Sequence, residues 1–228
     1  MMSEHALHAL RPATRQTLGE NVAESLREAI FRGLFKPGQR LAEAPIASTL
    51  KVSRAPVREA LASLEQEGLV SRTTNRGTTV ISLSRKDVEE ICSLRLPLEI
   101  LAVRQAIEKA TGAQWAELAA NVRETEKARS PEQLATLDLE FHQTLVRAAD
   151  HGRLLSTWLG LRSQVRLLMM RRNLSDAESH RATVRGHREL LEAMQKRDLA
   201  RAIEVVEVHH QRQYDWLIEG FDAVEAAG

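Results

Sequence analysis

The chain has 228 residues, of which 43% are hydrophobic and 28% charged, and its net charge is +1. This composition excludes a largely disordered chain, and the length allows one large domain or two modest ones. The single cysteine excludes an internal disulfide, no apolar stretch approaches the roughly 20 residues of a membrane helix, and the N-terminus lacks a signal-peptide core. We therefore expect a cytoplasmic protein with no membrane partner.

The first part of the chain is predicted to hold three short helices and a β-hairpin. Residues 1–17 have no clear period and are expected to form a flexible arm. Apolar spacing then predicts helices at about 20–33, 44–50 and 54–66, with glycine as a stop signal after the first and third. β-Branched residues on both sides of Asn75-Arg76-Gly77 predict two strands with Gly77 at the turn.

The rest of the chain is predicted to be helical. Helices are expected at about 86–110, 113–127, 131–150 and 154–171, then from a capping box at Ser175 to about 196, and at 199–219. The expected fold is therefore mainly α. A winged helix-turn-helix domain at 18–84 with a short β-hairpin wing precedes an all-α helical bundle at 85–228.

The stretch "VSRAPVREAL" has the features of a DNA recognition helix. Ser53 is the expected N-cap, and Arg54 and Arg58 are four residues apart, so both project from one face. Arginine can grip guanine or phosphate with its planar fork. An exposed arginine pair alone would also fit a merely solvated helix face. The order of three helices and a hairpin is what favours a winged helix-turn-helix, whose second motif helix enters the major groove.

The segment from Pro37 to Val80 resembles the DNA-binding domain of the GntR family of bacterial transcription regulators. "VSRAPVREAL", "EGLV" and "NRG" carry the resemblance, which covers about residues 18–82. It implies that Ser53, Arg54 and Arg58 contact operator DNA, with Arg76 and Gly77 at the wing tip.

Two positions depart from that family pattern. Lys51 stands where the family usually has glycine in the turn. Ala44 replaces an arginine that contacts DNA in some members, so we expect that contact to be absent here.

Four metal-capable side chains fall on apolar helix faces in the second domain. They are Asp138, His142, His187 and His209, spread over three predicted helices. Burying one such group needs a partner, and a single histidine or one Asp–His pair would fit a hydrogen-bonded core residue or a local salt bridge. Four together favour a divalent ion, with Zn²⁺, Ni²⁺, Fe²⁺ and Mn²⁺ not ranked. His210 competes with His209, because periodicity does not separate adjacent residues.

The second domain is also similar to a known effector domain. "LRLPLE", "DLEFH", "GHRELLEAM" and "RDLARAIEVVEVHH" resemble the FCD domain of the FadR branch of GntR regulators, over about residues 86–218. The resemblance implies an antiparallel bundle whose metal ligands are Asp138, His142, His187 and His209, and it favours His209 over His210. It also implies that the domain at 85–228 dimerises and binds an effector, and that the effector is a small carboxylate.

Arg95 matches an arginine that points into the pocket in this family and could grip a carboxylate. A salt bridge with Glu99, one turn away, is an equally good interpretation of the sequence.

Three functions remain open from the sequence. The favoured one is a homodimeric regulator that binds double-stranded operator DNA and responds to an organic acid, and is not an enzyme. A regulator that senses the metal itself is the second. A metal-dependent hydrolase is the third, but it lacks a general base, because Glu140 points away from the ligand face.

Overall fold

The computed structural model describes residues 17–73, 77–171 and 177–225. These form two compact units, one of residues 17–65 and 70–80, the other of residues 66–69 and 81–225. The predicted arm lies outside the described residues except for Thr17, and the predicted boundary near residue 84 stays a prediction.

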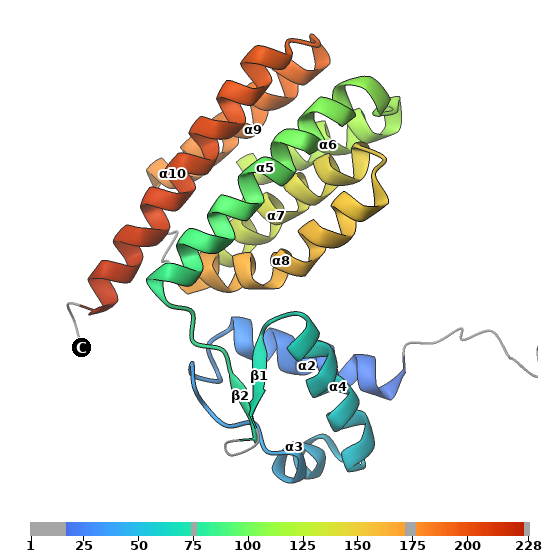
Figure 1. The fold of residues 1–228 in the computed structure, drawn as a ribbon, viewed down its shortest axis with the longest axis vertical. Helices are drawn as coiled ribbons and strands as arrows, with labels where there is room; N and C mark the ends of the chain where they lie inside the picture. Colours follow the sequence, from blue (N-terminus) through green and yellow to red (C-terminus); the bar gives the residue numbers. More distant parts are fainter. Residues whose placement is uncertain (1–16, 74–76, 172–176, 226–228) are drawn as a thin grey trace, which may run out of the picture. The chain divides into compact units, whose positions relative to one another are not determined.

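The N-terminal unit is a winged helix-turn-helix, as predicted. Its elements are α2 (Leu18–Phe31), α3 (Glu43–Leu50), α4 (Arg54–Gln66), β1 (Val70–Thr73) and β2 (Gly77–Val80) (Figure 1). Helix α2 begins with a capping box between Thr17 and Glu20. The core of the unit consists of buried aliphatic side chains from α2 and α4, among them Val22, Leu26, Ile30, Val57, Leu61 and Leu64.

The wing is an antiparallel pair with a fixed register. Val70 pairs with Val80 and Thr73 with Gly77, and a single bridge from Arg40 to Thr79 lengthens the β structure beyond the predicted hairpin. Gly77 has a φ of +72°, a left-handed conformation that favours glycine. Arg76, the predicted tip of the wing, lies outside the described residues.

The turn between α3 and α4 explains why a glycine would suit position 51. Lys51 is the C-cap of α3 and has φ 54° and ψ 43°, which is left-handed backbone. A side chain with a Cβ is strained there by roughly 1–2 kcal/mol. The glycine that the resemblance leads one to expect at this position would avoid that strain, which Lys51 imposes on this chain.

Lys51→Gly is therefore expected to stabilise the protein. The strain relieved in the folded state is larger than the entropic cost of the more flexible glycine in the unfolded chain. The net increase in the free energy of unfolding is about 0.5–1 kcal/mol. Urea unfolding of the full chain measures it. Lys36→Gly is the matched control, because Lys36 is exposed and has no positive φ. Equal or lower stability of Lys51→Gly relative to that control would contradict the expectation.

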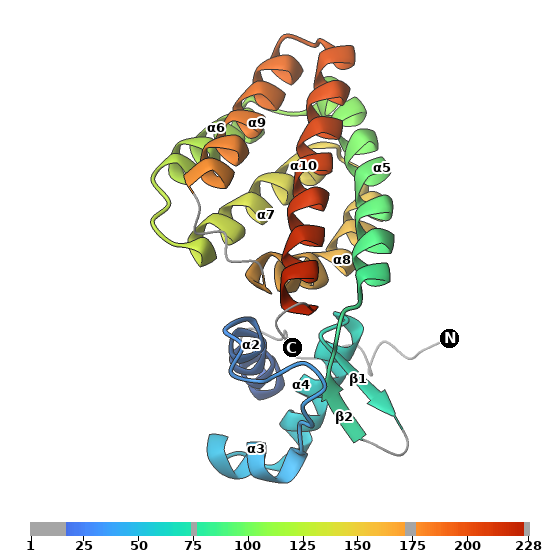
Figure 2. The same ribbon diagram turned by 90° about the vertical axis from the view of Figure 1, so that its left-hand side faces the viewer.

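The C-terminal unit is an all-helical bundle, also as predicted. Its helices are α5 (Arg85–Lys109), α6 (Gly112–Glu126), α7 (Pro131–Ala148), α8 (Gly152–Arg171), α9 (Ala177–Gln195) and α10 (Leu199–Glu225). Helix α10 packs between α5 and α9, and α7 packs against α5, α6 and α8 (Figure 2). None of the helices within the described ranges is long and apolar enough to span a membrane.

Local sequence signals set the starts of several of these helices. Ser84 and Asp87 form the predicted capping box at the start of α5, and Ser130 caps α7, whose first residue is Pro131. Helix α10 continues to Glu225, beyond the predicted end at 219, so Gly220 lies inside the helix and does not end it. One glycine costs a helix only about 1 kcal/mol and does not have to end it.

Helix α7 brings polar side chains into the bundle interior. Its buried face contains Leu134, Phe141 and Leu145, and the same face carries Asp138 and His142, both fully buried. The core around this face is closed by large side chains, including Trp158 of α8 and Met194 of α9. The bundle therefore holds two ionisable groups of α7 away from water.

Candidate functional site

The recognition helix α4 presents its predicted contact residues to solvent. Ser53, Arg54 and Arg58 are exposed, whereas Val57 and Leu61 on the opposite face are buried. One turn of helix separates the two arginines, so both side chains leave the same face. The geometry suits a helix that lies in a major groove, while the contacts themselves stay a prediction.

Arg58 is held by a residue that sequence reasoning missed. Its Nε donates to Oε1 of Glu43 at 3.1 Å, and its Nη2 donates to Oε2 at 3.0 Å. This two-point contact lowers the pKa of the Glu43 carboxyl and fixes the plane of the guanidinium. No local signal predicts the pair, because Glu43 lies in α3, fifteen residues before Arg58.

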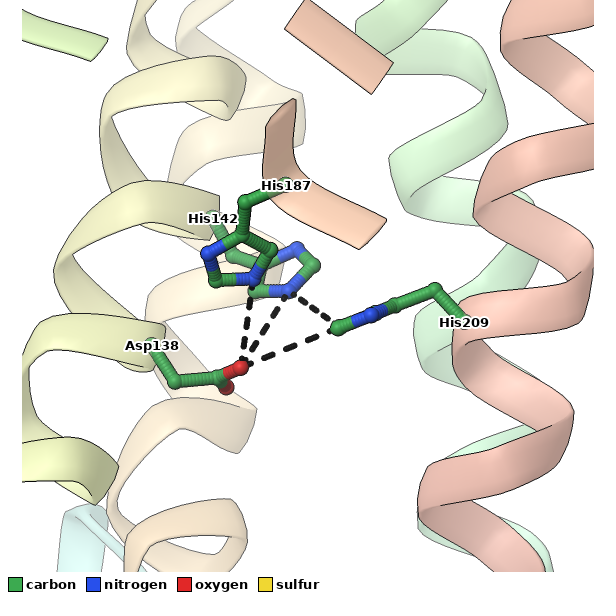
Figure 3. Close-up of side chains that lie close together, drawn as sticks. All are labelled: Asp138, His142, His187 and His209. Carbon is green, nitrogen blue, oxygen red and sulfur yellow. Dashed lines mark hydrogen bonds and ion pairs between the residues drawn. The ribbon is translucent and has the colours of Figure 1, made fainter. Parts of the chain in front are cut away.

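The four predicted metal ligands meet inside the bundle. Asp138 and His142 come from α7, His187 from α9 and His209 from α10, and Figure 3 shows His209 reaching the other three from the opposite side. Nε2 of His187 is 3.2 Å from Oδ1 of Asp138, and Nε2 of His209 is 3.7 Å from the same oxygen. Nε2 of His142 is 3.9 Å from that oxygen and 3.2 Å from Nε2 of His209.

These spacings fit a coordination shell. Ligand atoms that surround Zn²⁺ tetrahedrally at 2.0–2.1 Å lie roughly 3.3 Å from one another. In this cluster the four ligand atoms all lie within 4.8 Å of one another, and four of their separations are 3.2–3.9 Å. Small side-chain adjustments would bring all four atoms to metal-bonding distance.

The protonation states also suit a cation. Burial lowers the pKa of His142 to about 4, although the nearby Glu99 carboxylate opposes the shift. Burial and the two neighbouring imidazoles hold the pKa of His209 well below its usual range. Burial would raise the pKa of Asp138, but the imidazoles of His187, His142 and His209 lower it far below the usual range. At neutral pH the cluster therefore offers imidazole lone pairs and a carboxylate.

His187 has unused hydrogen-bonding capacity. Its side chain is fully buried and stacks on Phe141 with ring centroids 3.9 Å apart. Nε2 is near Asp138 but out of line for a hydrogen bond, and among the described residues neither ring nitrogen has a hydrogen-bond partner. A buried nitrogen without a hydrogen-bond partner that faces a carboxylate fits the role of a metal ligand.

Glu99 of α5 lies next to the cluster, and its two carboxylate oxygens are close to four side-chain nitrogens. Its Oε2 is 2.5 Å from Nδ1 of His142 and 2.8 Å from Nε2 of His210. Its Oε1 accepts from Nε of Arg95 at 2.7 Å and from the indole of Trp158 at 2.9 Å. A carboxylate on Nδ1 fixes the histidine tautomer whose Nε2 lone pair faces a metal.

The structure places the two adjacent histidines of α10 in different roles. Nε2 of His209 faces Asp138, whereas His210 turns to Glu99. Glu99, His142 and His210 are also close enough to form a metal-binding group. The donors that already occupy both oxygens of Glu99 make this second group the poorer cation site.

Arg95 fits both interpretations that the sequence left open, a salt bridge with Glu99 and a side chain that points into the bundle. It forms the salt bridge with Glu99, and its Nη1 donates to Oε1 of Gln213 at 2.8 Å, while Nη2 has no hydrogen-bond partner among the described residues. Gln213 in turn donates from Nε2 to Oδ1 of Asp138 at 3.0 Å. Sequence reasoning missed Gln213, which links Arg95 to the cluster.

A small cavity lies where these groups meet. Its volume is about 30 Å³, and its polar lining includes Arg95, Asp138, Thr183 and Gln213. That volume holds water but not an organic acid of several carbons. An acid could enter only if side chains moved, and Gln213 is the polar side chain between Arg95 and Asp138.

Glu99→Gln is expected to lower the affinity for divalent metal by roughly 10- to 100-fold, the usual effect of losing an outer carboxylate. A glutamine amide cannot accept from all four donors, so His142 loses its fixed tautomer. Competition with a chelator of known affinity measures the change. Glu140→Gln is the control, since Glu140 is exposed on α7. Equal metal affinity in both variants would show that Glu99 has only a structural role.

A winged helix-turn-helix joined to a helical domain with a buried polar cluster defines a DNA-binding transcription regulator. The chain belongs to the gntR family of bacterial regulatory proteins, whose domain matches residues 18–80, and the FCD domain matches residues 90–212. The HTH-type transcriptional regulator YdhC of Bacillus subtilis is 35% identical over 84% of this chain and 87% of its own length.

Other relatives and solved structures agree. The gluconate operon transcriptional repressor of B. subtilis is 29% identical over 89% of this chain and 86% of its own. The Nta operon transcriptional regulator of Aminobacter aminovorans is 31% identical over 81% and 87%. The structure of Escherichia coli McbR/YncC covers 91% of this chain and all of that one, with a TM-score of 0.76 and 23% identity, which supports the fold.

Proposed function

We propose that this regulator changes its affinity for operator DNA when a small carboxylate metabolite binds beside a divalent metal ion in the helical domain. One observation carries the proposal: three imidazoles and a carboxylate converge in the core, next to an arginine with an unpaired donor. Buried polar groups of this kind are stable only when they are satisfied by a ligand or by one another. The proposal also includes membership of the FadR branch, a cytoplasmic location and a domain boundary near residue 84.

In this proposal Asp138, His142, His187 and His209 hold the ion. Zn²⁺, Ni²⁺, Mn²⁺ and Fe²⁺ all accept a ligand set of three imidazoles and one carboxylate. When bound, the ion supplies positive charge and open coordination positions for an anionic ligand. Glu99 keeps His142 in the ligating tautomer, and the surrounding apolar core excludes water.

Arg95 is proposed to grip the carboxylate of the effector. Gln213 now occupies one of its donors and also bonds Asp138, so the entry of an acid requires the Gln213 amide to turn away. That movement would release Nη1 of Arg95 next to Nη2 and leave a two-point site for a carboxylate. One relative is a repressor of a gluconate operon, and gluconate is itself a carboxylate.

On DNA, Ser53, Arg54 and Arg58 are proposed to contact the operator in the major groove. Arg76 and Gly77 would reach the backbone or minor groove from the wing. Ionic and hydrogen-bonding contacts of this kind fix the position of a protein on DNA, while bidentate arginines also discriminate between bases.

The regulator is proposed to be a homodimer that forms through α5 and α8. Leu94 and Leu101 of α5 are two turns apart and 56% and 37% exposed, and Leu159 of the adjacent α8 is 41% exposed. Exposed leucines on two neighbouring helices suggest an interface. Sedimentation of Leu94→Glu/Leu101→Glu should show monomers, with exposed Leu34→Glu as control; an unchanged dimer would exclude this face.

Two other functions are weaker. A hydrolase would need a free general base near the ion, but Glu99 is fully engaged and Glu140 is exposed. We therefore propose that the protein is not an enzyme. A regulator that senses the ion itself uses the same four ligands, and only the response of DNA binding distinguishes it.

The test measures operator affinity as a function of both candidate signals, the divalent metal ion and the organic acid. An operator selected from random DNA is titrated with protein at fixed free Zn²⁺, with and without a panel of organic acids. We expect at least one acid to change the affinity only in the metal-loaded protein, and Arg95→Ala to abolish that change. Exposed Arg104→Ala, also in α5, is the control. A response to metal that no acid modifies would favour metal sensing instead.

A further inference from the structure

A second polar cavity lies on the outer side of the metal-ligand cluster, between α9 and α10. Its volume is about 160 Å³, and three arginines line it, Arg185 of α9 with Arg201 and Arg212 of α10. Glu189 is the one acidic residue in the lining. The cavity is distinct from the small one beside Arg95, since the only ligand that lines it is His209.

The arginines leave this cavity with an excess of positive charge. Arg201 bonds Glu189 at 2.9 Å and Glu204 at 2.9 Å, so its charge is matched. Arg185 and Arg212 are exposed, and no ion pair or hydrogen bond links either of them to another described residue. Two guanidinium groups that share a hollow without partners attract an anion.

His209 connects this cavity to the cluster. Its Nε2 faces Asp138 and His142, whereas its Nδ1 lies against Gly186, where an added Cβ would be only 2.8 Å from that nitrogen. None of the described groups is a hydrogen-bond partner of Nδ1. When Nε2 of a neutral imidazole ligates a metal, the remaining proton is on Nδ1. The amide Nε2 of Gln213 is 3.0 Å from Nε2 of His209 and, as a donor, favours the same tautomer. The lining of the cavity therefore includes an N–H donor, and metal ligation would fix its tautomer further.

We propose that this cavity binds a small oxyanion, such as a carboxylate or phosphate group, which accepts a hydrogen bond from Nδ1–H of His209. Arg185 and Arg212 supply the charge, and Gly186 leaves room beside the imidazole. The volume is about half of the lower limit for a drug-sized ligand, which restricts the occupant to a small anion.

The two sites would then be coupled through one imidazole. An acceptor on the second nitrogen makes a histidine a stronger metal ligand, as the outer carboxylates of metal sites do. By linkage, a bound ion also strengthens anion binding by the same factor. This inference rests on the proposed metal site for its coupling, but anion binding by the arginines does not.

Sulfate is a suitable probe because it binds the ion weakly. Full-length protein with ¹⁵N-labelled histidine is titrated with sulfate at constant ionic strength, both metal-free and loaded with Zn²⁺. We expect a saturable shift of the His209 Nδ1 resonance in both forms, with tighter binding in the loaded one. Arg185→Ala/Arg212→Ala should weaken sulfate binding at least about 10-fold. Arg181→Ala, which removes a charge from an exposed site on α9 outside the cavity, should not.

Metal affinity gives the second readout. Chelator competition in sulfate, compared with chloride, should show roughly 10-fold tighter Zn²⁺ binding in the original chain and no difference in the double variant. A His209 shift that does not saturate with sulfate, or that is equal in the original chain and the double variant, would mean an adventitious ion only. Either result would overturn the proposal. Weaker operator binding by the double variant without sulfate would assign the arginines to DNA phosphate instead. Saturable binding to metal-free protein without any metal effect would retain the anion site and reject the coupling.

Discussion

His187→Ala is expected to lower the affinity for divalent metal by at least roughly 100-fold. Loss of an outer partner already costs 10- to 100-fold, and His187 is itself one of four ligands. Asp138→Ala and His142→Ala should have similar effects and should also weaken the effector response. Chelator competition and metal analysis of the purified protein measure the change. The loss should be large because the three remaining ligands are fixed by the bundle and cannot close the gap.

Stability gives an independent check of this prediction. A ligand present at 100 times its dissociation constant stabilises a protein by about 2.7 kcal/mol, which corresponds to roughly 5–10 °C in Tm for a chain of this size. Chelation should therefore lower the Tm of the original chain and leave that of His187→Ala unchanged. His151→Ala, at an exposed position before α8, serves as the control. Metal retention equal to that of this control would remove the four-ligand site from consideration.

Arg54→Ala and Arg58→Ala are each expected to weaken specific operator binding by about 5- to 150-fold. A bidentate contact to a base contributes roughly 1–3 kcal/mol, and each 1.4 kcal/mol is a factor of ten in affinity. Binding assays on the selected operator and on random DNA, each at several salt concentrations, measure the effect. If an arginine reads a base, specificity falls at that position; if it contacts phosphate, all sequences weaken and the salt slope decreases by about one.

Arg32→Ala is a suitable control, because Arg32 is an exposed arginine in the same domain at the end of α2. Specific affinity retained in both recognition-helix variants would count against this interface. Glu43→Gln extends the test: it removes the carboxylate that now competes with DNA for Arg58. We expect it to raise affinity for random DNA more than for the operator, since the orientation of Arg58 is no longer fixed.

Local patterns in the sequence predicted much of the fold. Helix α4 has its predicted bounds, and the capping residues Ser84 and Ser130 stand where polar side chains precede apolar periods. Asp138, His142, His187 and His209 stood out because ionisable groups on apolar faces need partners. Periodicity shows that each of these side chains faces the interior. It does not show that all four meet at one point, because that depends on how the helices pack.

Local sequence patterns could not predict the residues that contact the cluster from other helices. Glu99 meets His210, which is 111 residues away, and Arg95 meets Gln213, which is 118 residues away. A sequence reader sees Glu99 only as the partner of Arg95 one turn earlier. Gln213 gives no signal, because a polar residue in a long terminal helix is ordinarily solvated. Contacts across the bundle depend on how α10 packs between α5 and α9.

The ring of contacts through Arg95, Glu99 and Asp138 has an electrostatic consequence. With neutral imidazoles, the interior holds two carboxylates and one guanidinium, so its formal charge is negative and repels an acid. A divalent cation reverses the sign and leaves an excess of positive charge in a region of low dielectric constant. The same pocket would then repel a carboxylate before the metal binds and attract it afterwards. The charges alone would therefore require the metal ion to bind first and the acid second.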